Sequence, residues 1–301
     1  MPALPDIHVG NPVGHEALVV FPLFTEPHTG VEYILSDEAI AAGAVTVAEV
    51  SEGGSVPNLL VDNQADTLVL FLEGEELRGA KQNRVLNTSV LVAARSRTPI
   101  PVSCVEQGRW RYHARHFAAG SHASSKLRHV LKKSVSRSAR EDQGHASDQG
   151  EVWKEVGRQM VALSSHSPTA AMADTYAAYD NRLKEYRERL RYVEGATGLA
   201  VAVGGKLVSV DVFDKPATCR KVWDRLLTGV VLDALEAGPA KEQAGGADVQ
   251  RELASLRDAP WQQTPAVGTG EEFRAEMEGD RHATALTCGG IVVHGSLVAA
   301  G

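Results

Sequence analysis

A stretch of five apolar residues at 68–72 is followed at once by a long polar segment, and this junction constrains the fold strongly. The apolar stretch has the sequence Leu-Val-Leu-Phe-Leu, and the polar segment at 73–84 has the sequence Glu-Gly-Glu-Glu-Leu-Arg-Gly-Ala-Lys-Gln-Asn-Arg. A strand that is apolar at every position is typical of burial on both faces. We therefore predict one strong strand over 67–77, with acidic side chains emerging at its C-terminal end.

Side chains alternate between the two faces of a strand. On the predicted strand, Glu73 and Glu75 would share one face with Val69, and Glu76 would lie on the other. Another predicted strand, at 99–106, ends in Glu106. The sequence therefore indicates that Glu106 lies near Glu73 or Glu75 if the two strands are neighbours.

The second polar segment, at 101–110, has the sequence Pro-Val-Ser-Cys-Val-Glu-Gln-Gly-Arg-Trp. Trp110 is suited to stack on a flat ring, and Arg109 can bind phosphate or carboxylate with two hydrogen bonds. Cys104 could act as a nucleophile, but a neighbouring acid raises the pKa of a thiol, and strand cysteines are usually packing residues.

Carboxylates and cations at this density allow three interpretations. In the first, an enzyme uses Glu75, Glu76 and Glu106 as catalytic acids or bases, with Glu73 and Glu75 as ligands of a divalent cation, to cleave a phosphoanhydride or N-glycosidic bond. In the second, the site only binds a nucleotide-like ligand. In the third, the charges form an ion-pair network that supports a loop. The substrate-binding candidates are Lys81, Gln82, Asn83, Arg84, Asn87, Arg109 and Trp110.

Several short predicted strands separated by Gly, Pro and Asn indicate an α+β fold, with a β-rich sandwich or roll in the N-terminal half. We predict a site-bearing half at 1–117 and a basic Ser/Gly-rich insertion or linker at 118–150. Residues 151–301 are expected to pack on the same core as helices and a returning β-hairpin with Gly204 and Gly205 as its turn. A short helix at 36–43 is also expected, with Ser36 as its N-cap, acidic residues in its first turn and Gly43 as its stop signal.

The segment 172–193 has apolar residues, including Tyr176 and Tyr186, at alternating steps of four and three. This spacing predicts one helix of about seven turns with a single apolar stripe. Such a stripe is typical of a core face or of a homodimer contact.

The chain has 31 Lys and Arg against 38 Asp and Glu, a net charge of −7. This acidic balance disfavours nucleic acid as a partner. The N-terminal residues do not resemble a secretion signal, and no apolar run approaches the roughly 20 residues that span a bilayer. We therefore expect a cytoplasmic protein that does not enter membranes.

The two polar segments, together with the hairpin sequence at 198–214, resemble the family named for the ARG and Rhodanese-Phosphatase-superfamily-associated protein domain, where ARG denotes ADP-ribosylglycohydrolase. The resemblance extends over nearly the whole chain and implies a link to NAD or ADP-ribose metabolism, as an enzyme or as a non-catalytic sensor or protein-interaction module. The positions that match the family pattern are Glu73, Glu75, Glu76, Lys81, Gln82, Asn83, Arg84, Cys104, Glu106, Gln107, Arg109 and Trp110.

Overall fold

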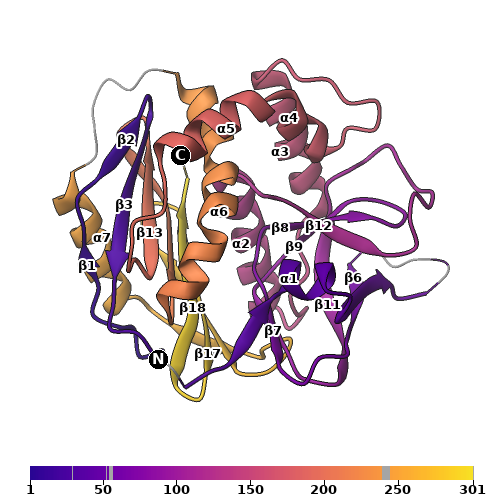
Figure 1. Cartoon of the computed structure of the whole chain (residues 1–301), viewed down its shortest axis with the longest axis horizontal. Coiled ribbons are helices and arrows are strands. Elements are labelled where there is room, and N and C mark those ends of the chain that lie inside the picture. The colour runs from indigo at the N-terminus through magenta and orange to yellow at the C-terminus, as the bar shows by residue number, and fades with distance from the viewer. Residues whose placement is uncertain (29, 52, 54–56, 239–244, 301) are drawn as a thin grey trace.

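The computed structural model describes residues 1–28, 30–51, 53, 57–238 and 245–300, and it has a mixed α+β fold (Figure 1). A large antiparallel sheet lies on one side of a layer of helices, and two smaller sheets from the N-terminal part of the chain lie on the other. Helix α6 (Pro216–Ala237) contacts strands of the large sheet and also β12 (Phe117–His122) of a smaller one. The predicted α+β class is confirmed.

The large sheet brings together both ends of the chain. Its strand order is β1-β3-β13-β14-β18-β17-β16-β15, with β2 paired to β3. Strands β13 and β14 form the predicted hairpin, and Gly204 and Gly205 turn it with φ values of +59° and +86°. Its strands are β1 (His8–Val9), β2 (Val13–His15), β3 (Leu18–Phe24), β13 (Gly198–Val203), β14 (Lys206–Phe213), β18 (Ile291–Ala299), β17 (Arg281–Cys288), β16 (Glu271–Met277) and β15 (Gln262–Thr264).

The N-terminal strands form two smaller sheets. The first has the order β12-β8-β9-β11-β6-β5, and the second has the order β10-β7-β4, in which β4 and β7 are parallel. Apolar side chains from both sheets pack together in one core cluster. Their remaining strands are β4 (Tyr33–Leu35), β5 (Val45–Glu49), β6 (Asn58–Asn63), β7 (Leu68–Phe71), β8 (Glu75–Gly79), β9 (Arg84–Leu86), β10 (Val90–Val92) and β11 (Ser96–Cys104).

The single strand predicted over 67–77 is wrong, because the chain turns between β7 and β8 and these two strands join different sheets. Gly74 has a φ of +79°, a conformation that glycine adopts without steric cost. The Glu75 N–H donates to the Leu72 carbonyl at 3.1 Å, and the Gly74 N–H donates to the Leu86 carbonyl at 2.9 Å. The acids on either side of this turn therefore do not alternate along one strand.

Helix α6 and the helix at 125–140 pack on the inner face of the large sheet, and the helix at 246–257 packs on its outer face. The short helix at 36–41 packs on the smaller sheets. The predicted short helix is present as α1, and Gly43 follows it with a φ of +68°. The predicted cap is wrong, because Leu35 is the N-cap residue and the Ser36 hydroxyl donates to Glu75 instead. No helix in the described part of the chain is both long and apolar enough to cross a bilayer. The remaining helices are α2 (Ser125–Arg140), α3 (Gln149–Ala162), α4 (Met172–Ala178), α5 (Asp180–Arg189) and α7 (Gly246–Arg257), and α1 is Ser36–Ala41.

The segment 118–150 differs from the predicted insertion or linker, because it contains most of β12, the packed helix α2 and the start of α3. Ser124 caps α2 by accepting a hydrogen bond from the Leu127 N–H at 3.2 Å, and Leu131 is buried. Two of the basic residues that suggested a solvated segment, Arg128 and Lys132, are buried as well. Composition was misleading here because the charges of these residues are compensated by partners far away in the sequence.

The long helix predicted over 172–193 is broken into α4 and α5 at Tyr179, whose φ of −108° lies outside the helical range. The Tyr179 hydroxyl donates to the Leu163 carbonyl at 2.6 Å. Tyr176 and Tyr186 are 4% and 0% exposed and pack in the main core of the chain. The apolar stripe is therefore a core face, covered by the chain itself, and it does not present an open surface to a second copy.

We expect Gly74→Ala to destabilise the protein more than Gly43→Ala. Both glycines have positive φ, which costs a non-glycine residue about 1–2 kcal/mol. An added Cβ at Gly74 would also lie 2.8 Å from Cε1 of His122 and 3.1 Å from Cγ of Arg128, whereas at Gly43 it would meet open space. Urea unfolding of the two variants checks this, and equal losses of stability would contradict the close packing at the turn.

Candidate functional site

The polar residues that lie close together in the sequence separate into several clusters in the structure. Glu73, Glu75, Arg84 and Glu106 each have different partners. The turn at Gly74 and the hairpin that follows it direct these side chains to different parts of the molecule. The candidate residues therefore do not form one site but belong to clusters with separate partners.

Glu73 lies in a buried charge network that joins the β7–β8 turn to helix α2 and strand β14. The Arg128 guanidinium donates to Glu73 Oε1 at 2.8 Å and holds both carboxylate oxygens of Asp211, at 2.6 and 2.9 Å. Lys132 donates to Glu73 Oε2, and its Nζ also donates to Thr284 Oγ1 at 2.5 Å. Two cations and two carboxylates thus balance one another inside the protein.

His294 extends this network to strand β18. Its Nε2 lies 3.1 Å from Asp211 Oδ1, and its Nδ1 lies 2.8 Å from Ser89 Oγ, which itself accepts the Glu73 N–H at 3.0 Å. Both ring contacts are satisfied when Nε2–H donates to Asp211 and Nδ1 accepts the Ser89 hydroxyl. The Phe213 ring stacks on the imidazole at a centroid distance of 4.9 Å.

The network is ionised at neutral pH. Burial acts to raise the pKa of Glu73, but the charges of Lys132 and Arg128 outweigh it and lower this pKa to about 2. Burial lowers the pKa of Lys132 to about 8, against the opposing effect of Glu73. The pKa of Asp211 is also lowered, because Arg128 and His294 outweigh its burial. Glu73 is therefore a structural counter-charge for α2.

Glu75 lies in a different buried cluster. Its Oε2 accepts the Ser36 hydroxyl at 2.6 Å, and its Oε1 lies 3.1 Å from Arg225 Nη1 of α6. Burial raises the pKa of Glu75, although Arg225 acts to lower it. Glu73 and Glu75, the predicted metal ligands, thus each pair with a different arginine. Among the described residues, the groups in which three or more candidate ligands converge include neither of them.

Arg84 is fully buried rather than open to a ligand. Its Nη1 donates to Gln82 Oε1 at 2.8 Å and to Cys104 Sγ at 2.5 Å, and its Nη2 lies 3.7 Å from a carboxylate oxygen of Glu49. Burial raises the pKa of the Cys104 thiol to about 11, which disfavours the reactive thiolate. This cluster fixes the loop before β9.

Trp110 is 48% exposed and covers the predicted cations from outside. Its ring centroid lies 5.5 Å from the Arg84 guanidinium carbon and 5.4 Å from Lys81 Nζ, within the range of cation–π contacts. Asn87 lies elsewhere, with its amide donating to the His145 carbonyl at 2.9 Å and its oxygen accepting from Ser103 at 2.6 Å. Lys81, Arg84 and Asn87 thus have partners within the chain.

Of the predicted residues, Asn83, Glu106 and Arg109 line a polar cleft of about 560 Å³. It lies between the β8–β12 ladder, the loop after β11 and the segment that leads into α4. Arg78, His113 and His116 are exposed cleft residues, so they can reach a ligand. The complete lining is Arg78, Gly79, Asn83, Glu106, Arg109, His113, Ala114, His116, Ala118, Ala119, Thr169, Ala171, Ala173 and Asp174.

Glu106 and Arg109 form a two-bonded ion pair in this cleft. Arg109 Nε donates to Glu106 Oε1 at 2.8 Å, and Nη2 donates to Oε2 at 2.7 Å. Glu106 also accepts the Asn83 N–H at 3.1 Å and the Thr169 hydroxyl at 2.9 Å. These bonds outweigh the effect of burial and lower the pKa of Glu106. Glu106 is therefore an ionised carboxylate with a fixed orientation.

Glu76 is a buried carboxyl that adjoins the cleft on its inner side. Its Oε2 accepts the Ser121 N–H at 3.0 Å, and its Oε1 has no hydrogen-bond partner among the described residues. Burial raises the pKa of Glu76 to about 7, with Glu106 and Asp174 also acting to raise it, against the hydrogen bond from Ser121 and the charge of Arg78. Three of the groups that act on this pKa therefore belong to the cleft.

Gly120 allows this close arrangement, because a Cβ at this position would lie 2.6 Å from Glu76 Oε2 and 2.7 Å from Arg78 Cγ. Arg78, Asp174 and Gly120 are not among the site residues predicted from the sequence. Arg78 lies within the polar segment at 73–84 and could have been considered. Nothing local in the sequence connects Asp174 with Glu76, which is almost a hundred positions away.

A family model for ARPP-1, the ARG and Rhodanese-Phosphatase-superfamily-associated Protein domain, matches residues 6–298. The chain belongs to this family. The match covers both the ARPP-1 segments recognised in the sequence and the helices that form the network around Glu73. Searches of curated proteins and of solved structures found no match.

Glu73→Gln should destabilise the protein by about 3–5 kcal/mol, because it removes one of two counter-charges from a buried cluster. Adding Lys132→Met should recover part of this loss, since Arg128 and Asp211 would still balance each other. Urea unfolding of the two single variants and the double variant measures the coupling. Strictly additive losses would contradict a shared network.

The free energy of unfolding of the Glu76→Gln variant should increase relative to that of the wild type as the pH rises. The folded pKa of Glu76, about 7, lies above its ordinary value of 4.5, so the folded state binds the proton more tightly than the unfolded state. The stability contribution of this proton is complete below pH 4.5 and is lost as the pH rises through 7. Glutamine mimics the protonated form and keeps the acceptor for Ser121.

The difference between variant and wild type should therefore grow between pH 5 and pH 8, by up to roughly 3 kcal/mol. Chemical unfolding at both pH values measures it. The exposed Glu278→Gln is the control for loss of a charge alone. A difference for Glu76→Gln that is the same at both pH values would contradict the raised pKa.

Proposed function

We propose that the chain is an enzyme that cleaves a bond in a small phosphorylated molecule of the nucleotide or ADP-ribose class, bound in the cleft beside Glu76 and Glu106. One observation carries this proposal: Glu106 in the cleft lining and the buried Glu76 behind it have pKa values shifted in opposite directions. Such pairs are typical of acid–base catalysis, because one group is a proton donor and the other a proton acceptor near neutral pH.

The roles follow from the surroundings of each carboxyl group. Glu76, with a pKa of about 7, would donate a proton to the leaving group. Glu106, held ionised by Arg109 and Thr169, would accept a proton from an attacking water. This arrangement suits hydrolysis of an N-glycosidic bond, for which a separated acid and base are sufficient.

The cleft also offers groups for an anionic ligand. Arg78, His113 and His116 are exposed on its lining, and an arginine can bind a phosphate with two hydrogen bonds. They replace Arg84 and Arg109 as proposed phosphate ligands, because the guanidinium groups of both are engaged within the chain. The ARPP-1 family is named for its association with ARG, the ADP-ribosylglycohydrolase, and this name supports an ADP-ribose-like substrate.

A second candidate is a sensor that binds the same class of ligand without chemistry. The observation that favours it is the pairing of Arg109 with Glu106, which neutralises the base in the absence of ligand. The two candidates share the cleft and differ only in turnover.

The test is incubation of the purified chain with NAD, ADP-ribose, ADP-ribosylated peptide and nucleoside diphosphates, with products followed by chromatography and binding by calorimetry. We expect turnover of one of these compounds. Glu76→Gln should lower kcat by about 10²–10⁴-fold and leave binding intact, whereas Arg78→Ala should mainly weaken binding.

Arg97→Ala is the matched control, because Arg97 is an exposed arginine on β11 that pairs with Asp62 and lies outside the cleft lining. Tight binding that depends on Arg78, without turnover, would favour the sensor. If the chain neither binds nor turns over any of these compounds, both candidates are overturned.

A further inference from the structure

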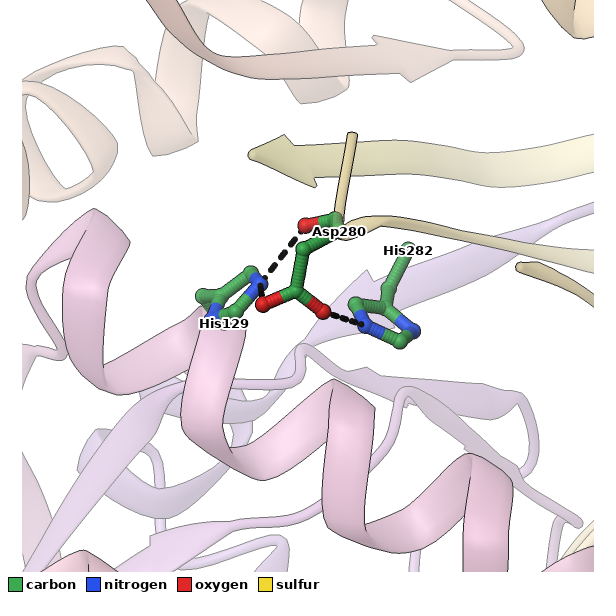
Figure 2. A group of neighbouring side chains, drawn as sticks. All are labelled: His129, Asp280 and His282. Atoms are coloured by element: carbon green, nitrogen blue, oxygen red, sulfur yellow. Dashed lines mark hydrogen bonds and ion pairs between the residues drawn. The ribbon is translucent and has the colours of Figure 1, made fainter. Parts of the chain in front are cut away.

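A second group of ionisable side chains lies between helix α2 and the β16–β17 turn, outside the proposed cleft. His129 comes from α2, Asp280 from the turn and His282 from the start of β17. Figure 2 shows both imidazoles directed at the Asp280 carboxylate. His129 Nε2 lies 3.5 Å from Asp280 Oδ2, and His282 Nε2 lies 3.2 Å from Oδ1. Candidate ligand atoms of all three residues lie within 4.8 Å of one another.

We propose that His129, Asp280 and His282 form a binding site for a divalent transition cation, with Zn²⁺ as the best fit. Zinc binds imidazole nitrogen and carboxylate oxygen at about 2.0–2.2 Å in a tetrahedral arrangement, which separates neighbouring ligand atoms by roughly 3.3 Å. The separations of 3.2 Å from His282 Nε2 to Oδ1 and 3.5 Å from His129 Nε2 to Oδ2 are close to this edge length, although they reach different oxygens of the carboxylate. Neutral imidazole also selects zinc over the hard cations Mg²⁺ and Ca²⁺.

The surrounding structure holds the three ligands in place. His129 lies next to Arg128 on a helix that is anchored by the Glu73 network, so its position along α2 is fixed. Asp280 has a φ of +55° in a turn whose preceding residue, Gly279, also has positive φ. The two histidine side chains are 11% and 6% exposed, whereas that of Asp280 is 42% exposed. A cation can therefore enter from solvent, with a water molecule as its fourth ligand.

In the apo chain, protons and Lys133 occupy the contacts that the cation would take. His129 Nε2 lies 2.8 Å from the Asp280 carbonyl oxygen, so it donates a hydrogen bond there. Zinc would bind Nε2 of the other tautomer, in which the proton lies on Nδ1. Lys133 Nζ donates to Asp280 Oδ2 at 2.9 Å. The Lys133 side chain is 57% exposed, so it can move away into solvent. The positive charge of Lys133 repels a bound cation, so removal of this charge should strengthen cation binding.

The experiment is calorimetric titration of the metal-stripped full chain with Zn²⁺. We expect one ion per chain to bind at this site. Asp280→Asn should weaken binding at least about tenfold, because it removes the anionic ligand. Asparagine tolerates positive φ and can accept the same histidine hydrogen bonds, so the variant should fold. Lys133→Met should instead tighten binding several-fold.

His15→Ala is the matched control, because His15 with Glu16 and Glu185 forms a second group of candidate ligands. Glu16 already accepts hydrogen bonds from Arg182 and from Tyr186, so this group should not hold the ion. The visible absorption of Co²⁺ in place of zinc reports the coordination number directly. The proposal is overturned if the wild type takes up no zinc, if Asp280→Asn binds as tightly as wild type, or if His15→Ala abolishes binding.

Discussion

The buried charges around Glu73 set the arrangement of the elements that surround them. Arg128 and Lys132 come from helix α2, Glu73 from the β7–β8 turn and Asp211 from the large sheet. A buried charge without a partner costs several kcal/mol, so none of these elements can move away without leaving one of the charges unpaired. The hydrogen bonds around His294 and Ser89 then leave few alternatives for the packing of α2.

This arrangement separates structural acids from candidate catalytic ones. Glu73 and Glu75 each pair with an arginine from a helix, which makes them counter-charges within the core. Glu76 has a different environment, because it accepts a single hydrogen bond, from Ser121, and has no arginine or lysine paired with it in the described structure. The effect of burial, which raises its pKa, is therefore not offset. The turn at Gly74 between Glu73 and Glu75, followed by the alternation of side chains along β8, places three acids within four positions in three different surroundings. Function is therefore proposed where charge compensation is incomplete.

Local sequence signals predicted several parts of the structure. The α+β class, the short helix at 36–41 and the hairpin turned by Gly204 and Gly205 follow from helix stop signals, periodicity and glycine pairs, which act over a few residues. The prediction of one strand at 67–77 was wrong because the apolar residues continue up to the turn at Gly74. The hydrophobic pattern therefore does not show that the strand ends there. The linker prediction for 118–150 was wrong because amino-acid composition does not distinguish buried basic residues, such as Arg128 and Lys132, from solvated ones.

The sequence by itself determined which chemical groups are available and which short elements they follow, because propensity, capping and turn preferences are properties of neighbouring residues. It also carried the family pattern, which spans residues 6–298. Only the tertiary structure decided which acid meets which base. Glu73 pairs with residues 55 and 59 positions away, and Thr284 is 211 positions away. Such pairing depends on how sheets and helices pack. A buried charge is stabilised by whichever opposite charge lies near it in space, whatever their separation along the chain.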